Sequence, residues 1–209
     1  MIDHLGGTKM ENKKLVGKDL ILTGALTALM FVIYMIVSIA MSLAGPVTNV
    51  FYPPVVSVAN GIVMMLLLAK VPKCGALSIA GVIQGLLTFL VGAFWTVGTG
   101  LIVGALLADF LIIRGKEIST KKMIAAYSVF SGIFTFGAIS PMNIFRDAFM
   151  DLTLRNGVSQ EYVDGLIRMT EWPMLTIIII AGFAGGFIGA LIGLKVLKKH
   201  FVKAGLVQG

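Results

Sequence analysis

The chain has 209 residues, a formal net charge of +7, and a composition that is 57% hydrophobic and only 13% charged. Its mean hydropathy of +0.97 excludes an ordinary water-soluble domain and indicates an integral membrane protein in contact with the lipid bilayer. In a soluble protein the positive charge would favour nucleic acid. Here the basic residues cluster between apolar runs and do not interleave with aromatic residues, so we expect no nucleic-acid partner.

Six apolar runs follow one another along the chain, at residues 19–44, 50–70, 75–93, 95–113, 123–145 and 173–194. Since about 20 helical residues cross the hydrocarbon core, each run is expected to span it. Lys and Arg precede the first run and follow the second, fourth and sixth, whereas the gaps after the first and third runs carry none. The positive-inside rule therefore predicts an all-α integral membrane protein, a compact bundle of six transmembrane helices with cytoplasmic N and C termini.

Three segments follow from this pattern: a polar N-terminal tail (1–17), a six-helix membrane domain (18–200) and a cytoplasmic C-terminal tail (201–209). We expect residues 1–14 to be disordered. The first run is too long for the apolar part of a cleaved signal peptide. The single cysteine, Cys74, forms no intramolecular disulfide.

Small residues recur at four-residue spacing in the first, third, fourth and sixth runs, which places them on one face of a helix. Such a face lets helix backbones approach closely in a membrane. Packing within the bundle is one interpretation, and docking of a partner helix is the other. The first run is the better candidate for docking because small residues line more than one strip of its helix surface. The sets are Gly24 and Ala28; Gly81 and Gly85; Gly100, Gly104 and Ala108; Gly185, Gly189 and Gly193.

Asp109 is a carboxylate inside an apolar run, near the cytoplasmic end of the fourth. An acid within a membrane segment suggests proton or cation coupling. It also lies about one helical turn from the inner interface, where it could pair with Arg114, Lys70 or Lys18. We favour a structural or partner-contacting role. The deeper Asn60 and Gln84 are expected to form hydrogen bonds between helices, and Gln84 could also reach a ligand.

The connector between the fifth and sixth runs, residues 146–172, is the one long segment outside the runs. Gly157 divides it, and Ser159 is a candidate N-cap for a helix whose apolar face comprises Tyr162, Val163, Leu166 and Ile167. The segment is thus an amphipathic outer element. It is either a lid over a site or a helix that lies in the lipid headgroups.

Aromatic, amide and hydroxyl side chains gather at the expected outer ends of the runs. They suit a flat small molecule with polar edges, and Arg146 could meet its carboxylate or phosphate. An interfacial aromatic belt would also place Tyr52, Trp95 and Trp172 there. The candidate substrate-binding residues are Asn49, Tyr52, Gln84, Trp95, Thr96, Thr99, Asn143, Arg146 and Trp172.

Enzyme chemistry has little support in this sequence. Both histidines, His4 and His200, lie in terminal segments, which excludes a membrane serine protease that needs a histidine inside the bundle. Neither an H-E-x-x-H helix nor a P-loop occurs. We therefore expect no catalytic residues, no metal and no cofactor.

Two segments carry a family resemblance. Lys18-Asp19-Leu20-Ile21 leads into Gly24-Ala25-Leu26-Thr27-Ala28-Leu29, and Gly104-Ala105-Leu106-Leu107-Ala108-Asp109 precedes Arg114. With six runs in about 200 residues, roughly residues 15–200 resemble the substrate-binding S component of an energy-coupling factor (ECF) transporter, in the Trep_Strep or MptD-like subgroup.

The resemblance implies capture of a vitamin or other micronutrient at the outer end, in the plasma membrane of a bacterium. It also implies association with a transmembrane coupling protein and two cytoplasmic ATPases, which would hydrolyse the ATP. By the same resemblance Gly24, Ala25 and Ala28 would contact the coupling protein. The subgroup fixes no substrate. Two alternatives stay open: a self-contained secondary transporter coupled to protons through Asp109, and a membrane scaffold subunit.

Overall fold

The structure is a computed structural model that describes the backbone of residues 8–9, 14–113 and 117–203, and the side chains of residues 14–111 and 119–199. Its elements in chain order are β1 (Thr8–Lys9), α1 (Gly17–Leu43), α2 (Pro46–Asn49), α3 (Tyr52–Lys70), α4 (Ala76–Leu90), α5 (Trp95–Ala108), the π-helical turn η1 (Asp109–Ile113), β2 (Glu117–Ile118), α6 (Thr120–Ile139), α7 (Pro141–Ile144), α8 (Arg146–Arg155), α9 (Gln160–Arg168) and α10 (Trp172–Lys203).

The all-helical prediction is confirmed for the body of the chain, with one local exception. Thr8 pairs with Ile118 and Lys9 with Glu117 in a two-residue antiparallel ladder. The expectation of disorder throughout residues 1–14 is therefore wrong at Thr8–Lys9. At the other end α10 continues to Lys203, beyond the predicted boundary at residue 200.

Among the described residues, four helices are long and apolar enough to cross a membrane: Gly17–Leu43, Tyr52–Lys70, Thr120–Ile144 and Trp172–Lys199. The two apolar helices Ala76–Leu90 and Trp95–Leu111 are shorter. α4, with 15 residues, extends about 22 Å against a hydrocarbon core of about 30 Å. α4 ends at a turn that contains Gly92, whose φ is +77°. This turn uses residues of the third apolar run, so the helix is shorter than the run. The expectation that every run is long enough to span is therefore confirmed for four helices and not for these two.

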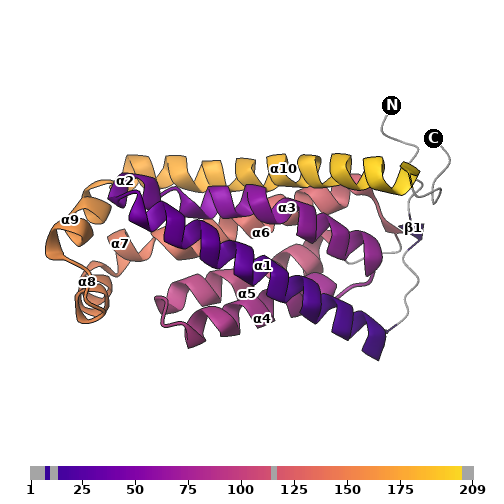
Figure 1. Cartoon of the computed structure of the whole chain (residues 1–209), viewed down its shortest axis with the longest axis horizontal. Helices are drawn as coiled ribbons and strands as arrows, with labels where there is room; N and C mark the ends of the chain where they lie inside the picture. Colours follow the sequence, from indigo (N-terminus) through magenta and orange to yellow (C-terminus); the bar gives the residue numbers. More distant parts are fainter. Residues whose placement is uncertain (1–7, 10–13, 114–116, 204–209) are drawn as a thin grey trace.

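Glycines allow the long helices to lie against one another. α10 runs beside α3 along one side of the bundle (Figure 1). A Cβ atom added at Gly185 would lie 2.6 Å from the Pro54 carbonyl oxygen, and one at Gly193 would lie 2.6 Å from that of Gly61. Gly85 faces the carbonyl oxygen of Gly98 in the same way, at 2.7 Å, where α4 meets α5. Main chains in contact at this range leave no room for a side chain, which is the packing role of small residues in membrane helices.

α1 carries small residues that are not used in this way. A Cβ atom added at Gly24 would meet nothing within 4 Å. Ala25 and Ala28 are exposed, and α1 is the least buried of the four long helices. Of the small-residue sets that the sequence offered, those on α4, α5 and α10 pack inside the bundle and the one on α1 stays open.

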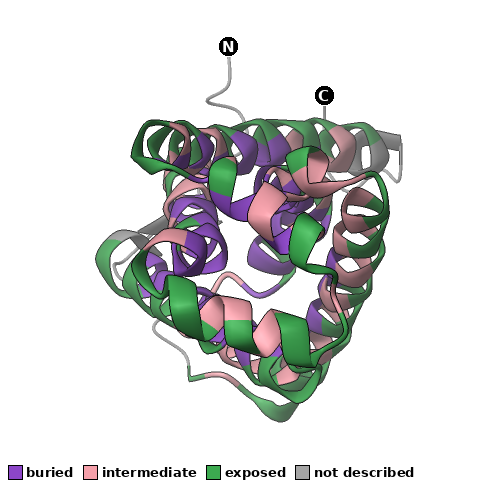
Figure 2. Cartoon of the chain, turned by 90° about the vertical axis from the view of Figure 1, so that its left-hand side faces the viewer, coloured by how far each residue is buried: buried purple, intermediate pink, exposed green. Residues whose placement is uncertain are grey.

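The two ends of the bundle differ in kind. The start of α1 and the ends of α3 and α10 lie together at one end, and α2, α7, α8 and α9 lie at the other (Figure 1). We call these the basic end and the α8–α9 end. Seen from the α8–α9 end, buried residues lie on the inner sides of the helices and exposed residues on the periphery (Figure 2). The exposed periphery is largely apolar, with Leu20, Ile36, Leu90, Phe110 and Ile180 all more than 45% exposed, as expected for a surface that faces lipid.

Candidate functional site

α9 is anchored to the rest of the α8–α9 end. As the sequence predicts, Ser159 caps it, with the hydroxyl oxygen accepting a hydrogen bond from the Tyr162 main-chain nitrogen at 3.3 Å. Its predicted apolar face is covered by protein, since Val163, Leu166 and Ile167 are at most 7% exposed. The Tyr162 hydroxyl donates to the Ser42 carbonyl oxygen at 2.9 Å, which ties α9 to the end of α1. This face of α9 therefore does not lie in lipid headgroups.

α8 is held differently. None of its residues is buried, and it meets the short α4–α5 turn through aromatic rings. The ring centroids of Trp95 and Phe145 are 5.2 Å apart, and those of Phe94 and Phe149 are 5.9 Å apart. Gly157, with φ of +83°, lies between α8 and the anchored α9. α8 is therefore held mainly by aromatic side-chain contacts. It lies between the irregular backbone at Phe145 and the glycine turn at Gly157.

A cleft opens where α7, α8, α9 and α10 meet, with a volume of about 320 Å³. That volume lies at the lower end of the range for small-molecule sites. Its wall is fixed by Asn143, whose Nδ2 donates to the carbonyl oxygen of Thr170 at 3.0 Å. The lining residues of this end cleft are Met142, Asn143, Arg146, Ile167, Arg168, Glu171, Trp172 and Pro173.

The end cleft carries two guanidinium groups and one carboxylate. In the part of the chain with described side chains, neither Arg146 nor Glu171 has an ion-pair partner within 4 Å, while Arg168 donates through Nε to the Asp164 carbonyl oxygen at 3.3 Å. The indole of Trp172 is 63% exposed beside them. Guanidinium groups bind carboxylate and phosphate through paired hydrogen bonds, and an indole offers a flat apolar face. The cleft is thus suited to a planar solute that bears an anionic group.

Three of the nine predicted substrate-binding residues come together here, namely Asn143, Arg146 and Trp172. Tyr52 and Gln84 lie elsewhere, in the interior of the bundle. Tyr52 is 9% exposed and meets Tyr34 and Phe134 edge to face, with centroids 6.1 and 6.4 Å away. Gln84 is 4% exposed and lines a central cavity of about 10 Å³. These two predicted residues therefore lie apart from the end cleft.

The remaining predicted residues form no part of either space. Trp95 packs on Phe145 at the α4–α5 turn, and Thr96 is buried with its hydroxyl unpartnered. The Thr99 hydroxyl donates to the Trp95 carbonyl oxygen at 2.9 Å, within its own helix. Asn49 is half-buried at the end of α2. The α4–α5 turn lies nearer the middle of the bundle than α8 and α9 do (Figure 1), and none of its residues lines the cleft.

Asp109 lies at the junction of α5 and η1, is 2% exposed, and serves the start of α4. Its Oδ2 accepts hydrogen bonds from the main-chain nitrogen of Gly75 at 2.7 Å and from the hydroxyl of Ser78 at 2.6 Å. A carboxylate at a helix N-terminus satisfies free N–H groups and complements the helix dipole. The contacts fit the structural role that we favoured from the sequence. Arg114, one of the partners considered, lies outside the described residues.

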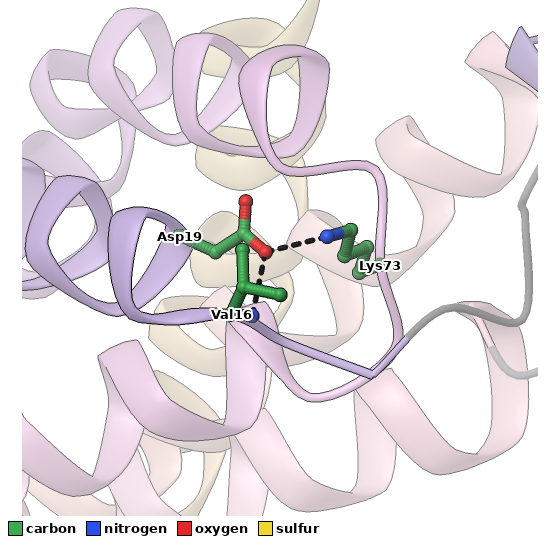
Figure 3. Close-up of polar contacts among 3 residues, drawn as sticks. All are labelled: Val16, Asp19 and Lys73. Carbon is green, nitrogen blue, oxygen red and sulfur yellow. Dashed lines mark hydrogen bonds and ion pairs between the residues drawn. The ribbon is translucent and has the colours of Figure 1, made fainter.

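A second carboxylate holds the loop between α3 and α4 from the other side. Oδ2 of Asp19 accepts from the Val16 main-chain nitrogen at 2.9 Å, within the first turn of α1, and forms an ion pair with Nζ of Lys73 (Figure 3). The loop of residues 71–75 between α3 and α4 is therefore tied to α1 by Lys73 and to α5 through Gly75. Polar contacts therefore fix the position of this loop at the basic end, which its lysines alone do not indicate.

Sequence reasoning missed Arg168 as a lining residue of the end cleft, and Tyr34 and Phe134 as neighbours of Tyr52. Arg168 directly follows Ile167, the last residue of the apolar face of α9, and lies four residues before the first residue of α10. Its closeness to α10 in sequence could therefore have indicated a place near the start of that helix. For Tyr34 and Phe134 no local signal exists, because each is one aromatic residue among many in an apolar helix.

Comparison with known proteins gave one match. Residues 17–203 match the model of a protein family described as a hypothetical bacterial integral membrane protein (Trep_Strep). Neither a curated protein nor a solved structure matched the chain.

Proposed function

We propose a role in solute uptake for this chain, which belongs to the Trep_Strep family of bacterial integral membrane proteins. In this proposal it is the non-catalytic S component of an ECF-type importer. It captures a vitamin-like or other micronutrient molecule at the α8–α9 end and passes it inward with a transmembrane coupling protein and two cytoplasmic ATPases.

The observation that carries the proposal is the open small face of α1. Gly24 has no neighbour where a Cβ atom would be, and Ala25 and Ala28 are exposed. Elsewhere in the described bundle, small faces are filled by neighbouring helices. A small face that no described residue covers allows another helix to approach its backbone closely, with van der Waals contact as the driving force. The resemblance assigns that place to the coupling protein.

The capture site in this proposal is the end cleft. Arg146 and Arg168 supply charge for a carboxylate or phosphate, Trp172 a flat face, and Asn143 a rigid wall. The net positive charge of the two guanidinium groups and one carboxylate favours an anionic solute. α8 serves as the lid, because Arg146 is its first residue and none of its residues is buried. α9 is the fixed part.

The proposal includes the topology that the sequence predicts. The chain crosses the plasma membrane six times, with α4 and α5 as a short hairpin whose turn lies below the outer surface and is covered by α8. Both termini and the basic end then face the cytoplasm. This orientation follows the positive-inside rule, and it lets the exposed lysines of the basic end interact with anionic lipid.

Fewer observations support the two alternatives. A proton-coupled transporter would need a titratable group in a solute path, whereas Oδ2 of Asp109 already holds the start of α4. A scaffold without a ligand would leave the unpaired charges of the end cleft without a role.

The test is reconstitution. The chain is purified in detergent, small molecules released by denaturing it are identified by mass spectrometry, and uptake of that compound into liposomes is measured. The proposal expects uptake only when coupling protein, ATPases and ATP are present with the chain. Uptake by the chain alone would contradict it and favour a secondary transporter. A folded chain that releases no compound above a mock purification would favour a scaffold.

A further inference from the structure

The centre of the bundle contains a buried polar atom that has no hydrogen-bond partner among the described residues. Asn60 on α3 is 5% exposed, and its Oδ1 has no hydrogen-bond partner. Gln84 on α4 is buried as well, at 4% exposed. Both line the central cavity. An unpaired amide in a nonpolar interior costs several kcal/mol in the limit of no partner, so such groups are almost always satisfied.

The orientation of Asn60 is fixed by its other bond. Nδ2 donates to the main-chain carbonyl oxygen of Met30 on α1 at 3.1 Å. Reversing the amide would set two acceptor oxygens against each other, so Oδ1 must be the atom without a partner. The missing partner therefore has to be a hydrogen-bond donor.

Two of the hydroxyl groups around the cavity already donate to main-chain oxygens and do not supply that donor. Tyr127 donates its only hydroxyl hydrogen to the Ser57 carbonyl oxygen at 2.6 Å. Ser57 donates its own to the Pro53 carbonyl oxygen at 2.9 Å. The other described lining residues are apolar apart from the hydroxyl of Tyr34, and none is charged. An ion in this space would have no opposite charge, so the occupant is neutral.

The size of the cavity selects the occupant. Its volume is about 10 Å³, and a buried water needs about 10–15 Å³ by the same measure, together with at least two polar partners. A cavity of this volume holds no molecule larger than water. Two of its lining residues, Tyr34 and Phe134, meet each other and Tyr52 edge to face, with centroids 6.1 to 6.4 Å apart.

We propose that the central cavity is a binding site for one water molecule, which donates a hydrogen bond to Asn60 Oδ1 and exchanges a second with the Gln84 amide. The water links α3 to α4 and fixes Asn60, which in turn holds the main chain of α1 at Met30. It is thereby part of what positions the middle of α1, just beyond the open small face. This site is independent of the end cleft and does not require the proposed function.

A double-mutant cycle on the full chain in detergent tests this. The variants are Asn60→Leu, Gln84→Met and the two combined, and the readout is the thermal unfolding midpoint. Each single variant removes one partner of the water and leaves the other side chain unsatisfied, so each lowers the midpoint. The double variant fills the cavity with apolar atoms and removes both unsatisfied groups, so its midpoint loss is smaller than the sum of the two.

The control pairs Gln84→Met with Thr96→Val. Thr96 also has a buried, unpartnered hydroxyl, but it does not line the cavity, so these two effects add. Additive losses for Asn60 and Gln84 would overturn the proposal. Should a variant fail to fold, a density map of the unmodified chain decides: a peak about 2.7–3.2 Å from Asn60 Oδ1 supports the site. An empty cavity in a map that shows other buried waters would also overturn it.

Discussion

Nζ of Lys73 lies 2.5 Å from Oδ2 of Asp19, which joins the first turn of α1 to the loop between α3 and α4 (Figure 3). Both side chains are largely shielded, at 20% and 16% exposed. On its other side the same loop is held by Asp109 through Gly75. α1, the helix with the open small face, is thus tied by polar contacts at three levels: by Lys73 at the basic end, by Asn60 in the middle and by Tyr162 at the α8–α9 end.

Replacing Lys73 measures the ion pair alone, because Asp19 keeps its bond to the Val16 nitrogen. We expect Lys73→Met to lower the free energy of unfolding only slightly, because ion pairs near the surface are screened by solvent. Asp19→Asn should cost more, since it weakens both contacts of Oδ2. Chemical denaturation at low and high salt checks this. An equal loss in Lys73→Met and Asp19→Asn would argue against a separate role for the Val16 bond.

Gly24→Leu and Ala28→Leu should abolish association with the coupling protein, because a large side chain holds the partner helix away from the α1 backbone. Stability should change little, since both positions are open. Gly85→Leu is the matched control: its Cβ would lie 2.7 Å from the Gly98 carbonyl oxygen, so overpacking costs about 1–3 kcal/mol or more. Co-purification and thermal midpoints separate the two effects. Unfolding of Gly24→Leu would assign this glycine to internal packing.

Arg146→Ala should weaken binding of the released compound by about 10- to 100-fold, the loss of one charge-assisted hydrogen bond of roughly 1.5–3 kcal/mol. The fluorescence of Trp172, one of two tryptophans, provides the readout. Arg155→Ala is the control, because Arg155 lies at the other end of α8 and pairs with Asp151 at 2.9 Å. Equal losses in both variants would point to a general effect of charge and not to the end cleft.

A cross-link between α8 and the α4–α5 turn should slow ligand entry and release, because α8 is the lid. Phe94→Cys and Phe149→Cys, joined by a short bifunctional maleimide in a Cys74→Ser background, test this. Ser42→Cys with Tyr162→Cys joins α9 to α1, which are already bonded, and should leave the rates unchanged. Faster or unchanged exchange in the first pair would rule out α8 as the moving part.

Asp109→Ala should lower the free energy of unfolding by about 2–4 kcal/mol, because it leaves three donors at Gly75 and Ser78 without an acceptor. Asp109→Asn retains a carbonyl oxygen and should lose less. Asp147→Ala, on the exposed side of α8, serves as control in the denaturation series. Abolished transport in an Asp109→Asn protein of unchanged stability would support proton coupling instead.

The sequence by itself determined the membrane class, the positions of the helices and the amphipathic helix after Ser159. These follow from hydropathy, from basic residues at run ends and from local capping, all of which act over a few neighbouring residues. It also predicted that Asn60 bonds between helices. It could not decide which small faces were used, because Gly24 and Gly85 have similar neighbours in sequence and differ only in whether another helix lies against them.

The tertiary structure decided how the polar residues group. Asn143, Arg146 and Trp172 converge because α9 packs on α1 and brings the start of α10 beside α7. Trp95 and Thr99 are excluded because the α4–α5 hairpin is short, and Gln84 lines the central cavity because its side of α4 faces the interior of the bundle. Each outcome depends on contacts between residues far apart in the chain. Hydropathy describes how a segment partitions between lipid and water, and it carries no information on which segment lies beside it.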